Sequence, residues 1–401
     1  MSDIEVYREK ARSFVEKHAA TFGAEARQGL SEEEDLALGR RWQSLKYEAG
    51  YVGIAWPSEW GGQGLTVLEK LAFDQEEMKH NFPTVYFSIS LGMPVPMFMR
   101  YAEGNWSKER VVKAMRGEEI WCQLFSEPAA GSDLAGLRLK AERDGDDWIL
   151  NGQKLWTSWA QYSDYGVIVT RTDPTVAKHK GLTYFWLDLR TPGVTVRPIK
   201  LTSGSSHVNE VFFDNVRVSD AQRMGVVGGG FAVAMETLFI ERYQALDSAG
   251  FGPSLDVFVD QVRNLILEGA PAIEDGRVRQ QIARNYAQRS ALEAIGMRAL
   301  RALAEGRTPG PEGSLNKLIS VRSRQILGEL AIDLMGVNGV RRDNDDNGSV
   351  RSDWVESWLD APTGRIAGGA DEMLLNTIAE KILGLPQDHR PDKGIAFKDI
   401  N

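Results

Sequence analysis

The sequence predicts an α+β protein, mostly helical, in which one β-rich part separates two helical parts. Apolar residues recur with a helical period in residues 1–118 and 226–388, and with a period of two in residues 119–225. We therefore expect an N-terminal helical domain, a middle β-sandwich or barrel, and a C-terminal four-helix bundle with these bounds. The polar residues 389–401 form a tail that we expect to be mobile.

In the N-terminal part, helix signals flank a loop. Residues 4–18 show helical periodicity, and Ser31 followed by Glu34 matches a capping box, which marks the start of a second helix. A third helical stretch covers residues 65–80. Residues 56–64 contain a proline and three glycines, which break a helix, so we expect an ordered loop there.

In the middle part, Asn151-Gly152 lies between two apolar stretches, residues 148–150 and 154–156. Because Asn-Gly accepts the positive φ of a tight turn, this arrangement predicts a β-hairpin. Further strands are indicated by short β-branched or aromatic stretches at residues 167–169, 183–187, 194–196 and 211–213.

In the C-terminal part, a triple glycine at residues 228–230 precedes a helical segment that begins at Phe231. Three more helical segments complete the bundle at residues 277–304, 316–335 and 371–383. The charged run at 341–346 is interpreted as solvated surface.

Composition limits the possible function classes. With 42% hydrophobic and 26% charged residues, the chain is typical of a soluble globular protein, and its net charge of −9 argues against nucleic acid or an anionic membrane as partner. No apolar run approaches the roughly 20 residues of a membrane span, and no leader-like segment opens the chain. The single Cys122 excludes an intrachain disulfide and is read as a core thiol, and the five histidines lack metal-ligand spacing. We expect a cytoplasmic protein without a metal.

Two segments could bind a ligand on their residue types alone. Residues 125–133 join small and hydroxyl residues, whose backbone N–H groups can approach an oxygen-rich ligand, although a simple interdomain turn explains them equally well. Residues 156–159 place two tryptophans where they could flank a planar aromatic ligand, although aromatic residues on strands are more often core.

The order of these motifs is also recognisable. Ser126-Glu127-Pro128-x-x-Gly131-Ser132-Asp133, followed by Asn151-Gly152-Gln153-Lys154-x-Trp156-x-Ser158, resembles motifs of the acyl-CoA dehydrogenase family. Four further stretches resemble landmarks of that family and lie at residues 57–65, 211–218, 336–339 and 378–384. The resemblance spans almost the whole chain, and the family has the same helical–β–helical order.

The resemblance implies an FAD bound between the β domain and the C-terminal helices. Ser126 and Ser158 match hydroxyls at the edge of the isoalloxazine ring, Trp156 matches the residue beside that ring, and Ser132 matches one near the pyrophosphate. The remaining cofactor-binding positions implied by the motifs are Phe125, Gly131, Gly336 and Asn338.

The family reaction also needs a carboxylate base. It removes the proton α to an acyl-CoA thioester while the β hydrogen leaves as hydride to flavin N5, giving a trans-2-enoyl-CoA. Many members carry this glutamate near the C-terminus, where this chain has Gly368, whose backbone N–H could still polarise the thioester carbonyl. A minority, resembling isovaleryl-CoA and long-chain acyl-CoA dehydrogenases, carries it on the helix that opens the C-terminal domain, and Glu241 lies at the matching place.

Local sequence agrees with Glu241 as the base. Ala234, Leu238 and Ala245 share its helical stripe, so an ionisable side chain lies among apolar ones, which is costly without a purpose. The alternative is an ordinary helix carboxylate paired with a cation. The helix dipole already explains an acid at the start of a helix, so Asp371 is kept only as a reserve candidate for the base.

Several positions depart from the family pattern. Asp333 replaces a usual glutamine, Val337 a glycine and Ala370 a threonine, and residues 268–275 lack the Arg and Phe that many relatives supply to a neighbouring subunit's FAD. A carboxylate facing the FAD diphosphate would repel it. Cofactor binding is then rearranged, weak, or completed by a different subunit.

Three hypotheses result. The leading one is an FAD-dependent acyl-CoA dehydrogenase, a homodimer or homotetramer, with an electron-transferring flavoprotein as acceptor. The second is a catalytically weak partner subunit that assembles with an active paralogue. The third is a flavin oxidase or monooxygenase on the same fold. Residues 86–99, rich in Phe and Met, are expected to line the acyl pocket.

Overall fold

A computed structural model describes residues 3–102, 105–244, 254–305, 307, 310–340 and 351–400. Its contacts divide the chain into two compact units: the β unit, which comprises residues 1–200, 206–241 and 389–401, and the helical unit, which comprises residues 201–205 and 242–388. The predicted order of helical, β and helical parts is confirmed. No helix in the described ranges is both long and apolar enough to cross a membrane.

The N-terminal part of the β unit is helical, as predicted. The capping box is present: the Ser31 hydroxyl accepts a hydrogen bond from the Glu34 amide, and the Glu34 carboxylate accepts one from the Ser31 amide at 2.8 Å. Trp42 and Phe82 stack at 4.2 Å in the core of this part. Its helices are α1 (Asp3–Phe22), α2 (Glu32–Glu48), α3 (Val67–Glu77), α4 (Val85–Gly92), α5 (Pro94–Tyr101) and α6 (Asn105–Met115).

The ordered loop expected at residues 56–64 is also present. It contains one 3-10 turn, Ser58–Trp60, and then Gly61 with φ of 85°. A Cβ on Gly62 would lie 2.3 Å from the Trp56 carbonyl oxygen, so only glycine fits there.

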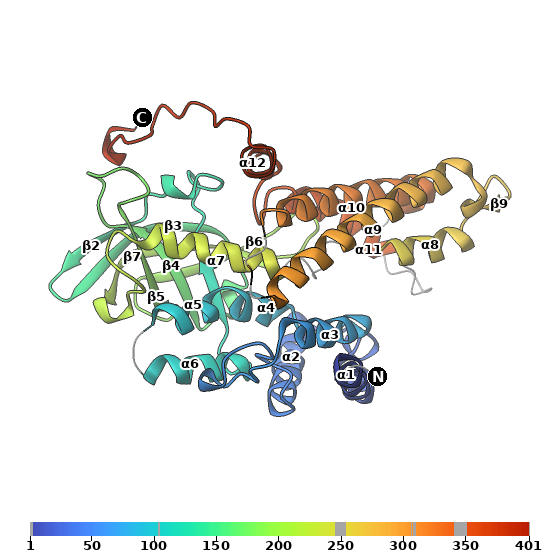
Figure 1. Ribbon diagram of the computed structural model, residues 1–401, viewed down its shortest axis with the longest axis horizontal. Coiled ribbons are helices and arrows are strands. Elements are labelled where there is room, and N and C mark those ends of the chain that lie inside the picture. The colour runs from blue at the N-terminus through green and yellow to red at the C-terminus, as the bar shows by residue number, and fades with distance from the viewer. Residues whose placement is uncertain are drawn as a thin grey trace. The chain divides into compact units, whose positions relative to one another are not determined.

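The middle part forms a seven-stranded curled sheet with the order β1-β4-β2-β3-β7-β6, and β5 pairs with β4 (Figure 1). The β1–β4 and β2–β4 pairs are parallel, and the other pairs are antiparallel. The strands, which include each of the predicted segments, are β1 (Trp121–Leu124), β2 (Lys140–Asp144), β3 (Asp147–Ser158), β4 (Tyr165–Arg171), β5 (Leu182–Asp188), β6 (Val194–Ile199) and β7 (Val208–Ser219).

The hairpin predicted at Asn151-Gly152 is wrong, because β3 runs straight through it. The turn between β2 and β3 lies at Gly145 instead, with φ of 63°. Gly152, with φ of 144°, forms an irregularity in the pairing with β7, and a Cβ there would lie 3.0 Å from the Leu139 Cα. The positive φ of Gly152, which indicated a turn, belongs to a β-bulge instead, and the long pairing of β3 with β7 stabilises this bulge.

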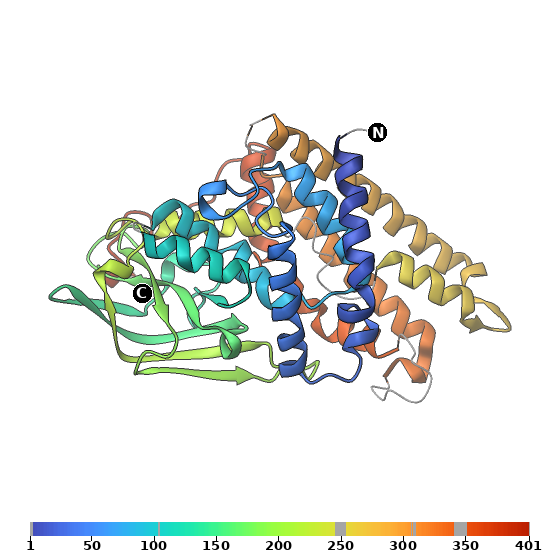
Figure 2. The same cartoon turned by 90° about the horizontal axis from the view of Figure 1, so that it is seen from below.

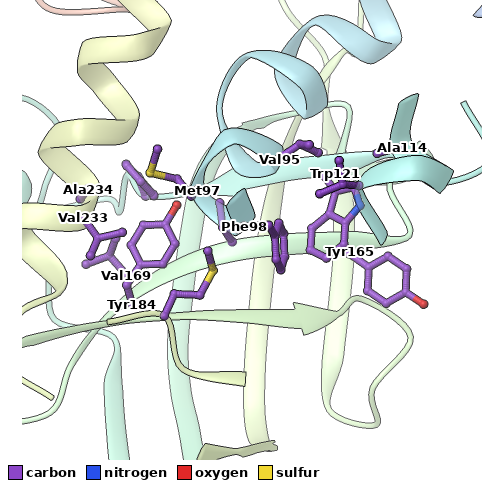
Figure 3. Close-up of a cluster of buried hydrophobic side chains, with 14 of the residues drawn as sticks. Val95, Met97, Phe98, Ala114, Trp121, Tyr165, Val169, Tyr184, Val233 and Ala234 are labelled. Atoms are coloured by element: carbon purple, nitrogen blue, oxygen red, sulfur yellow. The ribbon is translucent and has the colours of Figure 1, made fainter. Parts of the chain in front are cut away.

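Alternate residues of the strands enter two different cores. In β4, Val167 and Val169 face the helices of the N-terminal part, whereas Ile168 lies in a second core enclosed by the curled sheet. Figures 1 and 2 show α4, α5 and α6 on one side of the sheet, and Figure 3 shows Met97 and Phe98 packed with Trp121 and Tyr184 there.

Helix α7 (Gly230–Gln244) begins against the sheet. A Cβ on Gly230 would lie 2.6 Å from the Thr183 carbonyl carbon, so glycine allows the helix to start in contact with β5. Val233 and Ala234 are buried in the same core as the helices of the N-terminal part (Figure 3). The β unit thus includes most of α7.

The helical unit contains the helices predicted at residues 277–304, 316–335 and 371–383, whereas the one predicted from Phe231 is α7 and lies mostly in the β unit. It also contains two helices that periodicity did not indicate, α8 and α11. Its core includes Phe258 and Trp354, whose rings meet edge to face at 5.7 Å. The charged run 341–346 lies outside the described residues. A π-helical turn, Ile378–Ile382, follows α12, and β8 (Ile266–Leu267) and β9 (Ala270–Pro271) form a short ribbon. The helices are α8 (Leu255–Asn264), α9 (Gly276–Ala304), α10 (Gly313–Met335), α11 (Arg351–Gly364) and α12 (Asp371–Thr377).

The C-terminal tail is docked on the β unit, contrary to the expectation that it is mobile. The Phe397 amide donates to the Val176 carbonyl at 2.8 Å, and the Lys398 amide donates to the Pro174 carbonyl at 2.9 Å. In Figure 1 the red end of the chain lies beside the strands. Backbone hydrogen bonds, which sequence polarity does not report, hold this segment.

Candidate active site

The loop at residues 125–133 is a tight turn held against β3. Glu127 and Ala130 exchange two backbone hydrogen bonds, of 2.9 and 3.0 Å. The Leu155 amide donates to the Ser126 carbonyl at 2.8 Å. The structure thereby brings Ser126 next to the residue that precedes Trp156, so the two predicted ligand-binding segments meet.

A buried ion pair fixes this loop. Lys154 Nζ lies 2.8 Å from Glu127 Oε1 and donates to the Phe125 carbonyl at 3.0 Å. Glu127 also accepts hydrogen bonds from the amides of Arg138 and Leu139, at 2.6 and 3.0 Å. Burial lowers the pKa of Lys154, and the nearby Glu127 carboxylate partly offsets this effect. Because a buried charge without its partner is costly, each of these two residues holds the other in place.

Arg171 fixes the other end of the same segment. Its guanidinium is buried at the end of β4 and donates to the carbonyls of Ala135 at 2.5 Å, Leu137 at 3.2 Å and Lys178 at 2.7 Å. Burial lowers its pKa to about 10, so it stays charged at neutral pH. Sequence reasoning gave no role to Glu127, Lys154 or Arg171. The signal that could have identified them is a charged residue within an apolar strand or within the loop at residues 125–133.

The predicted cofactor residues of the β unit differ in exposure. Phe125 is buried against Tyr184, and the side chains of Ser126 and Ser158 are half-buried. Gly131 and Ser132 are exposed, and within the described part of the chain their amides have no hydrogen-bond acceptor. Two adjacent free N–H groups are suited to bind an anion.

The two tryptophans do not flank a common ligand. Trp156 is 55% exposed, with φ of 61°, at an irregularity of β3. Trp159 packs against Tyr86 at 4.8 Å between ring centroids and belongs to a hydrophobic cluster. The ligand-binding interpretation therefore remains for Trp156, and the core interpretation holds for Trp159.

These residues fit an FAD. Trp156 exposes an indole on β3, and half-buried hydroxyls lie on the same strand at Ser158 and on the adjoining loop at Ser126, which suits a flat ring with a polar edge. The amides of Gly131 and Ser132, which have no acceptor among the described residues, suit a diphosphate. In the described residues, no group of three His, Cys, Asp or Glu could hold a metal ion.

Glu241 lies in the C-terminal half of α7. Two members of its predicted apolar stripe are packed as expected: Ala234 is fully buried and Leu238 lies against the same core. Ala245 and the side chain of Glu241 lie outside the described residues. The nearby Glu236 is paired with Arg100 at 2.6 Å and accepts a hydrogen bond from Tyr101.

In the helical unit, Gly336 ends α10 with φ of 56° and opens a 3-10 turn, Gly336–Val340. Asn338 lies in this turn, and its side chain is outside the described residues. Asp333 is exposed, and Val337 is 81% exposed. The positions that depart from the family pattern thus include two that lie on the surface of this unit.

Gly368 lies between α11 and α12 with φ of 66°, and Gly369 follows with φ of 104°. The Gly369 carbonyl accepts a hydrogen bond from Lys317 at 2.5 Å. A left-handed backbone favours glycine, so this loop conformation fits the absence of a side chain at the position where many relatives have the base.

Asp371 does not serve as a free base. Its carboxylate accepts hydrogen bonds from Arg365 at 2.7 Å and Arg322 at 3.0 Å. Burial alone would raise the pKa of Asp371, but the two guanidinium groups outweigh this effect and lower it. The ion pairs anchor the end of the loop that carries Gly368.

The expected acyl pocket at residues 86–99 is not supported for its largest side chains. Tyr86, Met97 and Phe98 are buried in hydrophobic clusters, and the Tyr86 hydroxyl donates to Asp35 at 3.0 Å. Aromatic and methionine side chains on these helices mainly build the core.

Together, the helical–β–helical fold and the flavin-compatible loop define an FAD-dependent oxidoreductase. Family models for the acyl-CoA dehydrogenase N-terminal, middle and C-terminal domains match residues 2–118, 122–216 and 228–383. The chain therefore belongs to the acyl-CoA dehydrogenase family, whose members use FAD. The predictions of family, enzyme class and cofactor are confirmed.

Curated relatives agree. The acyl-CoA dehydrogenase IpdE1 of Mycobacterium tuberculosis is 32% identical over 400 residues, which is 97% of this chain and 99% of that protein. FadE34 of the same organism is 36% identical over 342 residues, which is 85% of this chain. The chain spans 45% of the length of FadE34.

Solved structures share the fold. The ChsE4-ChsE5 complex from M. tuberculosis matches with a TM-score of 0.81 at 24% identity, over 97% of this chain and 99% of that chain. Butyryl-CoA dehydrogenase from Megasphaera elsdenii matches with a TM-score of 0.75 at 22% identity, over 94% of this chain and 97% of that chain.

Proposed function

We propose that this chain catalyses the FAD-dependent α,β-dehydrogenation of an acyl-CoA thioester to a trans-2-enoyl-CoA, with Glu241 as the base for the α proton. One observation carries the choice of base. Gly368 has a left-handed backbone and no side chain, and the neighbouring Asp371 is engaged by two arginines. This supports Glu241 on α7, the position that the family resemblance indicates, as the base.

The chain's own residues have distinct tasks in this proposal. A carboxylate that removes a proton from a weak carbon acid must be shielded from water, and apolar residues of α7, Ala234 and Leu238, accompany Glu241. The Gly368 amide donates to the thioester carbonyl and stabilises the negative charge that develops there. FAD, when bound, accepts the β hydrogen as a hydride.

We assign cofactor binding to the residues that the family motifs indicate. Trp156 lies beside the flavin ring, Ser126 and Ser158 hydrogen-bond its edge, and the amides of Gly131 and Ser132 bind the diphosphate. Phe125 supports the loop from beneath, since it is buried against Tyr184. Gly336 and Asn338 complete the set. We propose a homodimer or homotetramer in the cytoplasm that passes electrons to an electron-transferring flavoprotein.

The test is anaerobic reduction of the bound flavin by a panel of acyl-CoA thioesters, and the loss of flavin absorbance is the readout. Glu241→Gln should keep FAD bound and slow flavin reduction by at least about 100-fold, the low end of general-base effects. Glu236→Gln is the matched control, the same change on the same helix, and should reduce at nearly the normal rate. Rapid reduction in Glu241→Gln would remove this residue from the mechanism. Fast peroxide formation in air would instead indicate an oxidase.

A second candidate function is supported by the surface of the helical unit. Asp333 and Val337 are exposed where relatives have residues that contact FAD, and a carboxylate there repels a diphosphate. The ChsE4-ChsE5 complex shows that chains of this fold occur in assemblies of two different subunits. On this reading the chain is a partner subunit of an active paralogue. A colourless purified chain that gains FAD only on co-expression with a paralogue would support it, whereas a yellow homo-oligomer supports the first proposal.

A further inference from the structure

The tail, residues 389–400, packs over the connection between β4 and β5. Ala396 and Ala177 form an antiparallel bridge, and the amides of Phe397 and Lys398 donate to the carbonyls of Val176 and Pro174 at 2.8 and 2.9 Å. These contacts are all within the β unit. The tail therefore adds a backbone-paired edge to this connection.

One tail side chain, Phe397, covers the buried guanidinium of Arg171. The Phe397 ring lies 3.8 Å from the Arg171 guanidinium carbon. The same guanidinium donates to the carbonyls of Ala135 and Leu137, which follow the loop at residues 125–133. The ring excludes water from a cation whose hydrogen bonds fix that turn, and a cation over an aromatic face is itself favourable.

A second tail side chain reaches the loop through one lysine. Lys178 Nζ lies 2.5 Å from Asp392 Oδ2 and 2.8 Å from Asp133 Oδ2. Asp133 directly follows Ser132, whose amide has no hydrogen-bond acceptor in the described part of the chain. The tail is thus linked to residues 133–137, which directly follow Ser132, at two places. Lys178 joins it to Asp133, and Arg171 joins it to the carbonyls of Ala135 and Leu137.

We propose that the C-terminal residues 389–400 are a strap that positions the cofactor loop, with Phe397 and Asp392 as its positioning residues. The inference rests on the proposed function in one respect, that the loop at residues 125–133 binds FAD. The physical reason is preorganisation. A loop that is already ordered loses less conformational entropy when it binds a ligand, so the strap strengthens binding without touching the cofactor.

The test uses the full-length chain, with and without FAD. Two variants weaken the strap: Phe397→Ala and Asp392→Asn. Two controls match them: Phe397→Tyr keeps the ring over Arg171, and Asp399→Asn makes the same acid-to-amide change at an exposed tail position. Hydrogen exchange of the amides of residues 133–139 is measured without FAD, and the FAD dissociation constant is measured by titration.

We expect Phe397→Ala to raise the FAD dissociation constant by about tenfold, equivalent to ~1.4 kcal/mol. Asp392→Asn should raise it by about threefold. Both should speed exchange at residues 133–139 and leave exchange in β6 and β7 unchanged, while the two controls match the parent protein. A loss of thermal stability with unchanged exchange at 133–139 and unchanged FAD affinity would show a merely structural tail and overturn the proposal.

The failure of the strap and the failure of the proposed function are distinguishable. If the parent chain binds no FAD, the proposed function fails, and the exchange measurement still decides whether the tail orders the loop. If the parent chain binds FAD and Phe397→Ala binds it equally well, the strap is refuted and the dehydrogenase proposal stands.

Discussion

Lys154 on β3 and Glu127 on the loop at residues 125–133 form an ion pair of 2.8 Å whose two side chains are buried. The pair joins two segments that lie 27 residues apart and carry Ser126 on one side and Trp156 on the other. Its burial makes the geometry of the loop depend on both charges.

Removing one charge of this pair should therefore be costly. We expect Lys154→Met to lower the free energy of unfolding of the β unit by about 3 kcal/mol, because Glu127 is left charged and buried. Adding Glu127→Gln should recover part of this loss, because no uncompensated charge remains. Denaturant unfolding of the parent, both single variants and the double variant gives the coupling energy. Strictly additive effects would contradict the assignment.

The two tryptophans should respond to truncation in opposite ways. Trp156→Ala should change the unfolding free energy of the chain without FAD by less than about 0.5 kcal/mol, as is usual for an exposed site, and weaken FAD binding at least tenfold. Trp159→Ala should cost about 3 kcal/mol of stability, because it empties a packed aromatic site. Equal FAD affinity in the parent and Trp156→Ala would remove this indole from the cofactor site.

Asp371 should stabilise the helical unit in a pH-dependent manner. At pH 7, Asp371→Asn should lower the free energy of unfolding by about 1–2 kcal/mol, less than for a fully buried pair because both arginines are partly exposed. The folded-state pKa of Asp371 is lowered, so its contribution is complete above about pH 4 and is lost as the pH falls through the folded-state value. Urea unfolding of parent and variant at pH 7 and pH 3 should show the difference shrinking. Glu372→Gln, at the exposed neighbour, should show no such dependence.

Two glycines in the helical unit should respond oppositely to alanine. Gly368 has φ of 66°, so Gly368→Ala should destabilise by about 1 kcal/mol. Gly296 lies inside α9, and apart from the nearby backbone of its own helix no atom of the described residues lies within 4 Å of the position that an added methyl group would occupy. Gly296→Ala should therefore stabilise by about 0.5–1 kcal/mol. Thermal unfolding of both variants tests this, and a stabilising Gly368→Ala would argue against the left-handed loop.

Local signals predicted the fold where the structure is local. The capping box at Ser31 and the periodicity of α9 and α10 depend on residues within a few turns, so sequence alone was sufficient. Asn151-Gly152 misled because its partner strand, β7, lies some 60 residues away and converts a turn signal into a bulge. The tail misled because backbone hydrogen bonds from Phe397 and Lys398, which residue types do not indicate, help to dock it.

The candidate site was predicted by motif and not by physics alone. Resemblance located Ser126, Ser132 and Trp156, which the structure places on one loop and one strand. The buried charges of Glu127, Lys154 and Arg171 were missed, because charged residues are read by default as solvent-exposed. Only the three-dimensional pairing shows that they are the framework of the loop.

The curled sheet gives β4 a double constraint. Val167 and Val169 lie in one core and Ile168 lies in the other. A single inserted residue would therefore turn the side chains that follow it from each core into the other. Natural length variation in this protein should therefore avoid β4 and concentrate in surface connections, where an extra residue disturbs neither interior.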